Sequence, residues 1–164
     1  MPLFKPAKMF HRVTDITADY LRSIGVEGLA LDADNTLSTH HSQTALEGVP
    51  EWLEMMKNEQ IKLIMVSNSK SRRVKPFAEK LGLDYLSLSC KPLPFAFLKA
   101  KRKLGLKGSQ LAAVGDQLFT DMLGANLAGI TPIHVTPIQA EDGASFKLRR
   151  KLESVLIKRY RKKM

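Results

Sequence analysis

Residues 29–37 read Leu-Ala-Leu-Asp-Ala-Asp-Asn-Thr-Leu, so a short apolar run ends in two carboxylates spaced one residue apart. Residues 29–31 have the character of a buried parallel strand, and the polar residues after them are typical of a turn. At the carboxyl end of such a strand, the curling chain can direct Asp32 and Asp34 at one point. Two neighbouring carboxylates repel each other unless a cation or a shared proton relieves them. The stretch therefore favours a divalent-metal site, although an isolated Asp-x-Asp more often only completes a turn.

Three more polar clusters follow apolar runs further along the chain. They are Ser67-Asn68 after residues 61–66, Lys91-Pro92 after residues 83–88, and Gly115-Asp116, which closes residues 111–115 before Thr120-Asp121. Together with residues 32–36, these clusters resemble in order and spacing the four motifs of the haloacid dehalogenase (HAD) superfamily of aspartate-dependent phosphatases. The resemblance covers about residues 29–135.

Two longer runs narrow the resemblance. They are Leu-Asp-Ala-Asp-Asn-Thr-Leu at residues 31–37 and Gly-Asp-Gln-Leu-Phe-Thr-Asp at residues 115–121. With the Ser67 and Lys91 clusters, they are similar to the YqeG group of bacterial subclass III phosphatases, which is related to the mitochondrial phosphatidylglycerophosphate phosphatase. This similarity implies hydrolysis of the terminal phosphate of phosphatidylglycerophosphate, which is a lipid.

Strand and helix patterns alternate along the chain. Strands are predicted at residues 29–31, 61–66, 83–88, 111–115 and 131–135, and helices at 17–24, from about residue 50, and at 72–81, 95–104 and 118–128. This alternation indicates an α/β fold with parallel strands and helices on both faces of the sheet. The resemblance implies a HAD-like Rossmannoid three-layer sandwich with strand order 5-4-1-2-3 and no large cap domain. Pro132 lacks an N–H donor and is expected at the edge of the sheet.

The resemblance also implies a role for each polar cluster. Asp32 is the expected nucleophile, which forms an aspartyl-phosphate, and Asp34 is the expected acid and base, a role that needs a raised pKa. Mg²⁺ is expected between the Asp32 carboxylate, the Asp34 backbone carbonyl and Asp116. The phosphate contacts are assigned to Ser67, Asn68 and Lys91, and supporting roles to Thr36 and Asp121.

The charge of the chain is concentrated at its C-terminal end. The net charge is +10, and residues 147–164 hold nine Lys or Arg residues against one Glu. The chain is therefore divided into an N-terminal arm (1–16), a HAD-like catalytic domain (17–138) and a basic amphipathic tail (139–164). Such a tail suits an anionic membrane or RNA, and a merely solvated end explains it equally well. Its apolar stripe (Leu148, Leu152, Val155 and Leu156) suits either a bilayer or the protein's own helices.

Other classes of enzyme lack their signatures here. A cysteine-dependent phosphatase needs an arginine six positions after its cysteine, but Ala96 stands there after Cys90, which is expected to be buried. The chain has no Gly-x-x-x-x-Gly-Lys-Ser/Thr loop and no Gly-x-Gly-x-x-Gly. His40 and His41 are adjacent on a loop, which favours a place at the entrance of the site over metal binding.

Taken together, these features predict a magnesium-dependent phosphatase whose substrate is an accessible phosphate ester at a membrane surface. The single cysteine fits a reducing cytoplasm, and no apolar run approaches the roughly 18 residues of a spanning helix. The protein is therefore expected in the cytoplasm or at the inner face of the membrane. Two alternatives stay open at this stage: a phosphatase of soluble esters or phosphoproteins, and an RNA-associated basic protein with little turnover.

Overall fold

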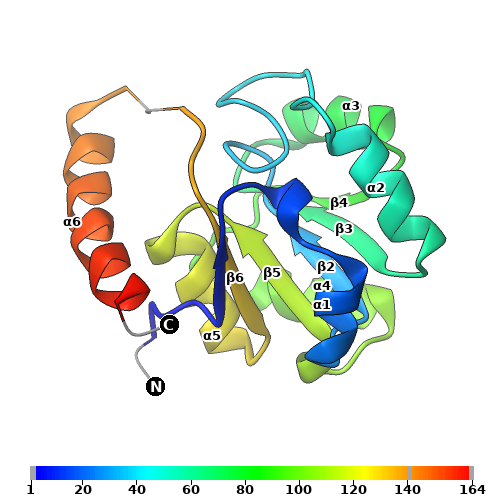
Figure 1. The fold of residues 1–164 in the computed structure, drawn as a ribbon. Helices are drawn as coiled ribbons and strands as arrows, with labels where there is room; N and C mark the ends of the chain where they lie inside the picture. The colour runs from blue at the N-terminus through cyan, green and yellow to red at the C-terminus, as the bar shows by residue number, and fades with distance from the viewer. Residues whose placement is uncertain (1–2, 140–141, 163–164) are drawn as a thin grey trace.

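A parallel sheet lies between two layers of helices in the computed structural model, which describes residues 3–139 and 142–162 (Figure 1). The strands are β1 (Lys8–Phe10), β2 (Gly28–Leu31), β3 (Lys62–Val66), β4 (Asp84–Leu86), β5 (Leu111–Gly115) and β6 (Thr131–Val135). Their order across the sheet is β1-β6-β5-β2-β3-β4, and every neighbouring pair is parallel. The α/β class and the parallel pairing predicted from the sequence are confirmed.

The sheet packs against a different set of helices on each face. The helices are α1 (Ala18–Ser23), α2 (Val49–Asn58), α3 (Ser71–Lys80), α4 (Phe95–Leu104), α5 (Leu123–Ala128) and α6 (Ala144–Arg161). Leu29 and Leu31 of β2 join a core with α1, α2 and α3, whereas Ala30 joins a core with α4 and α5. Successive residues of a strand point to opposite faces, so one short apolar strand contributes to both cores.

The predicted five-strand order is wrong at one edge, because β1 adds a sixth strand beside β6. Pro132 therefore does not lie on an edge strand. Its carbonyl accepts a hydrogen bond from the N–H of Ala7 at 2.7 Å, just before β1 begins. In a parallel ladder, the N–H and C=O of one residue point the same way, so the donor that proline lacks faces the start of β1. The short strand at residues 8–10, inside the predicted arm, has too few residues to show a pattern in the sequence.

Local signals set most element boundaries as predicted. Thr17 caps α1, because its side chain accepts a hydrogen bond from the N–H of Tyr20 at 3.1 Å. The predicted helix at residues 118–128 is instead a π-helical turn, Leu118–Met122, followed by α5. A π turn inside a helix often marks a functional position, and this one begins two residues after Asp116.

The C-terminal helix α6 stands apart from the two layers and packs beside the π-helical turn (Figure 1). Tyr160 is 7 % exposed and forms a small core with Leu118 and Met122, against which Leu156 and Ile157 also pack. The rest of the predicted stripe points to solvent: Leu148, Leu152 and Val155 are 62 %, 53 % and 64 % exposed. The stripe is thus divided, since only Leu156 serves the protein's own packing.

Neither end of the chain is wholly within the described part. Residues 1 and 2 of the predicted arm, and 140, 141, 163 and 164 of the predicted tail, lie outside it. Within the described residues, no helix combines the length and the apolar character that a membrane crossing requires.

Replacing Tyr160 by Ala should release α6 from the body of the protein. Truncation of a buried aromatic side chain costs about 3 kcal/mol, because the apolar contact is lost and a cavity remains. We expect the free energy of local opening of α6, measured by amide hydrogen exchange, to fall by that amount. Val155→Ala on the exposed face is the matched control and should change it by less than about 0.5 kcal/mol. Equal effects of the two changes would contradict the packing described here.

Candidate active site

The polar clusters found in the sequence meet at the carboxyl edge of the sheet. Asp32 follows β2, Ser67 follows β3, Lys91 lies in the loop after β4, and Asp116 follows β5. A pocket of about 180 Å³ opens there. It is lined by Asp32, Asp34, His40, His41, Ser67, Asn68, Ser69, Lys91, Gln117, Thr120, Asp121, Phe146 and Arg149. Parallel sheets bind their ligands at this edge.

Lys91 is at the centre of the site. Its Nζ donates to Oδ1 of Asp32 and to Oδ1 of Asp121, both at 2.6 Å, and to the carbonyl oxygen of Val66 at 3.1 Å. These bonds use all three ammonium donors, and the side chain is only 4 % exposed. Lys91 therefore has a single position, between the predicted nucleophile and a second carboxylate.

The backbone around Lys91 is held by Asn68. The amide Oδ1 of Asn68 accepts from the N–H of Lys91 at 2.8 Å, and its Nδ2 donates to the carbonyl of Lys91 at 3.2 Å. Two nearby residues, Leu88 and Cys90, adopt left-handed φ angles of 47° and 51°. Such conformations cost about 1 kcal/mol or more without glycine and persist where surrounding contacts impose them. Asn68 thus positions Lys91 and also lines the pocket, while its contact with the phosphate stays a prediction.

Asp121 reaches the site from the π-helical turn. Its Oδ2 accepts from the N–H of Gln117 at 3.2 Å, which leaves Oδ1 for Lys91. Gly115 makes this approach possible, because a side chain at that position would collide with the Asp121 carboxyl group. In the structure Asp121 therefore holds Lys91 beside Asp32.

Burial is the largest single influence on the pKa values of Asp32, Lys91 and Asp116. It raises the pKa of Asp32 to about 7, although Lys91 opposes the shift and Asp121 adds to it. Burial lowers the pKa of Lys91, but the carboxylates of Asp121 and Asp32 outweigh it and raise that pKa overall. Burial also raises the pKa of Asp116 well above its ordinary value. The positive charges around Asp32 and Asp116 therefore do not offset the effect of burial, and a bound cation would add the charge that favours their ionised forms.

Asp34 differs from what the sequence predicted. Its pKa is lowered, not raised, because hydrogen bonds from Arg73 and from the backbone N–H of His41 outweigh the effect of burial. Arg73 Nη1 donates to Oδ2 of Asp34 at 3.0 Å, and Nη2 donates to Oδ1. Sequence reasoning missed Arg73, which lies on α3 and has no motif of its own. In this structure Asp34 is thus held as an ionised carboxylate.

The residues fit a divalent cation at Asp116. Oxygen atoms of Asp32, Asp116 and Asp121 lie within 4.8 Å of one another. Asp116 Oδ1 is buried and has no hydrogen-bond partner among the described residues. The other oxygen, Oδ2, accepts from Arg150 of α6, which also donates to the Asp116 carbonyl at 3.1 Å. Asp116 and Asp32 are accordingly the residues suited to hold the ion, because both carboxylate oxygens of Asp121 already accept hydrogen bonds, from Lys91 and from the N–H of Gln117.

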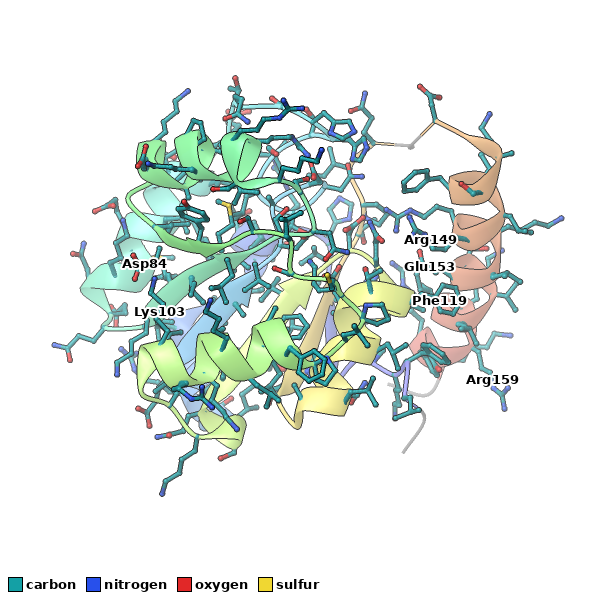
Figure 2. The ribbon with its side chains drawn as sticks, turned by 180° about the vertical axis from the view of Figure 1, so that it is seen from behind. Asp84, Lys103, Phe119, Arg149, Glu153 and Arg159 are labelled. Carbon is teal, nitrogen blue, oxygen red and sulfur yellow. The ribbon has the colours of Figure 1, made fainter. Side chains whose placement is uncertain are left out.

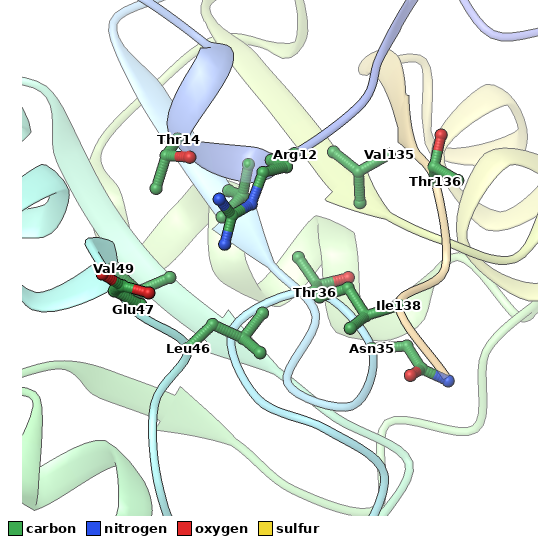
Figure 3. A pocket seen from close by; sticks show the side chains of 11 residues that line it. Arg12, Thr14, Asn35, Thr36, Leu46, Glu47, Val49, Val135, Thr136 and Ile138 are labelled. Atoms are coloured by element: carbon green, nitrogen blue, oxygen red, sulfur yellow. The ribbon is translucent and has the colours of Figure 1, made fainter. Parts of the chain in front are cut away.

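Thr36 and Cys90 are not among the residues that line the pocket containing Asp32. Thr36 lines a separate pocket of about 10 Å³, with Asn35, Arg12 and Thr136 around it (Figure 3). The supporting role of Thr36 therefore stays a prediction. Cys90 is exposed, and the prediction that it is buried was wrong. In the loop after β4 the buried residues are instead Ser89 and Lys91, which are 6 % and 7 % exposed.

The remaining wall of the pocket comes from the loop after β2 and from α6. His40 and His41 line the pocket, and the His40 ring lies 6.1 Å from the ring of Phe146. Phe146 and Arg149 of α6 face them. Sequence reasoning missed Phe146 and Arg149, because it separated the basic tail from the catalytic domain. Nothing in their local sequence shows that α6 folds back to the edge of the sheet.

A carboxylate held by a buried lysine, next to a serine hydroxyl and an acidic cation site, is suited to phosphoryl transfer at the edge of an α/β sheet. Fold and site together define a hydrolase of phosphate esters. The haloacid dehalogenase-like hydrolase family matches residues 9–129. The chain belongs to that family, and it is a HAD-type phosphatase, a phosphoric monoester hydrolase.

Known proteins support this assignment. The chain is 36 % identical over 160 residues to "Probable phosphatase YqeG" of Bacillus subtilis, covering 98 % of this chain and 93 % of that protein. It is 34 % identical over 101 residues to a phosphoglycolate phosphatase of Chromobacterium violaceum, covering 56 % of this chain and 45 % of that one. In fold, it is similar to an uncharacterized protein from Listeria monocytogenes, with a TM-score of 0.59 and 20 % identity, covering 72 % and 85 % of the two chains.

His134 is a buried residue of β6 that contacts the backbone of Asp116. It should make the stability of the protein sensitive to acid. Its Nε2 donates to the Asp116 carbonyl at 3.1 Å, and burial lowers its pKa from 6.5 to about 4. Between these two values the unfolded chain binds a proton that the folded protein does not, so stability falls as pH falls. Without metal, lowering the pH from 7 to 4 should cost the native protein about 3 kcal/mol more than it costs His134→Gln.

Urea unfolding at each pH, in the presence of EDTA, measures this difference. His11→Gln changes an exposed histidine and serves as the control, which should keep the pH dependence of the native protein. Identical pH profiles for the native protein and His134→Gln would contradict a neutral, buried His134.

Proposed function

We propose that this phosphatase hydrolyses phosphate monoesters with Mg²⁺ through an aspartyl-phosphate on Asp32. The observation that carries the proposal is the position of Lys91, which bonds Asp32 at 2.6 Å within a pocket that also contains Ser67. Asp32 provides the nucleophilic oxygen, Ser67 provides a hydroxyl donor for a phosphate oxygen, and Lys91 provides positive charge beside Asp32 and the phosphate. When bound, Mg²⁺ would neutralise charge on the phosphate and on Asp32 and Asp116.

The proposed reaction has two steps. In the first, an Asp32 carboxylate oxygen forms a bond to phosphorus while the bond to the leaving oxygen breaks, and Asp34 gives that oxygen a proton. In the second, Asp34 removes a proton from water, the water oxygen bonds to phosphorus, and the acyl phosphate bond breaks. Inorganic phosphate leaves and Asp32 is free again. Because Arg73 holds Asp34 ionised in this structure, the acid role requires that substrate binding raise the pKa of Asp34.

Asp32→Asn tests the nucleophile. The amide keeps the shape of the side chain but cannot form the acyl phosphate, so kcat on an aryl phosphate with Mg²⁺ should fall at least about 10³-fold. Asp19→Asn makes the same chemical change at an exposed position on α1 and should leave kcat unchanged. EDTA should abolish the activity of the native protein. Turnover by Asp32→Asn within tenfold of the native value would refute the mechanism.

We also propose that the substrate is a phospholipid such as phosphatidylglycerophosphate, reached at the cytoplasmic surface of an anionic membrane. The outer face of α6 supports this: Leu148, Leu152 and Val155 are exposed there. The exposed cations of α6 are Lys147, Lys151, Lys158, Arg159 and Arg161. Exposed aliphatic side chains beside cations suit a helix that lies on an anionic bilayer. In this proposal the predicted catalytic domain, residues 17–138, supplies the reacting groups, α6 completes the wall of the pocket, and the site needs no large cap.

Vesicle binding tests the membrane proposal. Burying one leucine side chain contributes about 1.5 kcal/mol, so Leu152→Glu should weaken partition onto vesicles of anionic phospholipid by at least about tenfold. Leu127→Glu alters a leucine of α5 that is 49 % exposed and serves as the control. Activity of both variants on a soluble ester should remain that of the native protein.

Two outcomes would favour the alternatives. Equal vesicle binding by Leu152→Glu and the native protein would remove α6 as the lipid contact. Retention by RNA that falls steeply with salt, without binding to vesicles, would favour an RNA partner.

A further inference from the structure

The tail helix does more than pack on the body, because one of its faces forms part of the catalytic pocket. Phe146 and Arg149 line the same pocket as Asp32, Ser67 and Lys91. In Figure 2, Arg149 extends from α6 toward the sheet, whereas Arg159 extends away from it. A cation is therefore placed at the wall of a phosphate pocket by an element outside the four motifs.

The anchoring of α6 brings Arg149 to this position. Glu153 is only 1 % exposed; its Oε2 accepts from Arg150 at 2.9 Å and its Oε1 accepts from the N–H of Phe119 at 3.3 Å. Arg150 in turn donates to Asp116. These bonds fix the turn of helix that contains Arg149 against the carboxyl ends of β5 and the π-helical turn.

Arg149 itself has no anionic partner among the described residues. None of the carboxylates in residues 3–139 and 142–162 pairs with it, and its Nε is buried without a hydrogen-bond acceptor. Its Cζ instead lies 4.5 Å from the centre of the Phe146 ring. Stacking on an aromatic ring orients a guanidinium and leaves its in-plane donors available. Every neighbouring arginine on the site side differs in this respect, since Arg73 pairs with Asp34 and Arg150 with Asp116.

The reacting phosphate already has a hydroxyl donor in Ser67 and a positive charge nearby on Lys91. The pocket, at about 180 Å³, is smaller than the roughly 300 Å³ at which drug-sized ligand pockets begin. The phosphate and the nearest part of the leaving group therefore fill it, and Arg149 belongs to its wall. A guanidinium with free donors is matched by a carboxylate or a phosphate, because both accept two parallel hydrogen bonds.

From this geometry we infer a second anion-binding subsite, formed by Arg149 stacked on Phe146, that selects phosphomonoesters whose leaving group carries a further negative charge. The inference rests on the proposed function and narrows its substrate class. The further charge is either a carboxylate or a phosphodiester. A phospholipid such as phosphatidylglycerophosphate carries the second of these, and a soluble phosphorylated acid carries the first.

Paired soluble esters measure the subsite. Ethyl phosphate and 2-phosphoglycolate are of similar size and differ in the carboxylate, while glycerol 3-phosphate and its glycerophosphodiester extension differ in the diester. For each pair, the selectivity is the ratio of kcat/KM for the anionic ester to kcat/KM for the neutral one. A hydrogen bond to a charged group contributes about 1.5–3 kcal/mol, so Arg149→Met should lower the selectivity about 10- to 100-fold for the preferred pair.

The change should appear mainly as a higher KM for the anionic ester, and Arg149→Lys should recover part of the loss. Lys151→Met removes the same charge from the exposed face of α6 and is the matched control, which should keep the native selectivity. The pair that responds identifies the anion as a carboxylate or a diester.

Two results would overturn the subsite. One is an unchanged selectivity in Arg149→Met for both pairs, and the other is an equal loss in Lys151→Met, which would reflect only the overall charge of the helix. Failure of the proposed function looks different, because the native protein would then hydrolyse none of the four esters in a manner that depends on Asp32.

Discussion

The ammonium group of Lys91 is the interaction on which the site depends. It lies between Asp32 and Asp121 on a side chain that is only 4 % exposed, and its third bond goes to the carbonyl of Val66 at the end of β3. Bringing three charged groups out of water is unfavourable, and only their mutual attraction and full hydrogen bonding offset it. Removal of the ammonium would leave two carboxylates buried beside Asp116. The loops after β2, β4 and β5 are therefore coupled through one cation.

The same need for positive charge explains why α6 belongs to the site. Asp116 is fully buried, and Arg150 is its cationic partner among the described residues, with Glu153 completing the set of bonds. The basic sequence of α6 suggested a separate tail. In the structure Asp116, the most buried acid of the site, holds this helix at the carboxyl edge of the sheet. The inner face of the helix closes the pocket and its outer face remains exposed. The helix α6 thus connects the catalytic pocket to the proposed membrane-binding face.

The motifs could be found in the sequence because each combines a short apolar run with a polar residue at its end. Strands buried on both faces need such runs, and the carboxyl ends of parallel strands bring the polar residues together. Asp32, Ser67, Lys91 and Asp116 were recognised in this way. Arg73 and Arg149 were not, because an arginine on an amphipathic helix has the same sequence pattern whether it faces solvent or a carboxylate.

The sequence by itself determined the class of fold, the strands β2 to β6 and the residues of the four clusters, since these depend on local hydrophobic pattern and turn chemistry. Only the tertiary structure decided that residues 8–10 extend the sheet past Pro132, that Asp34 is ionised by Arg73, and that Arg149 faces the pocket. The physical reason is that each of these rests on a pairing between segments far apart in the chain. The energy of such a pairing belongs to neither segment alone, so no local pattern records it.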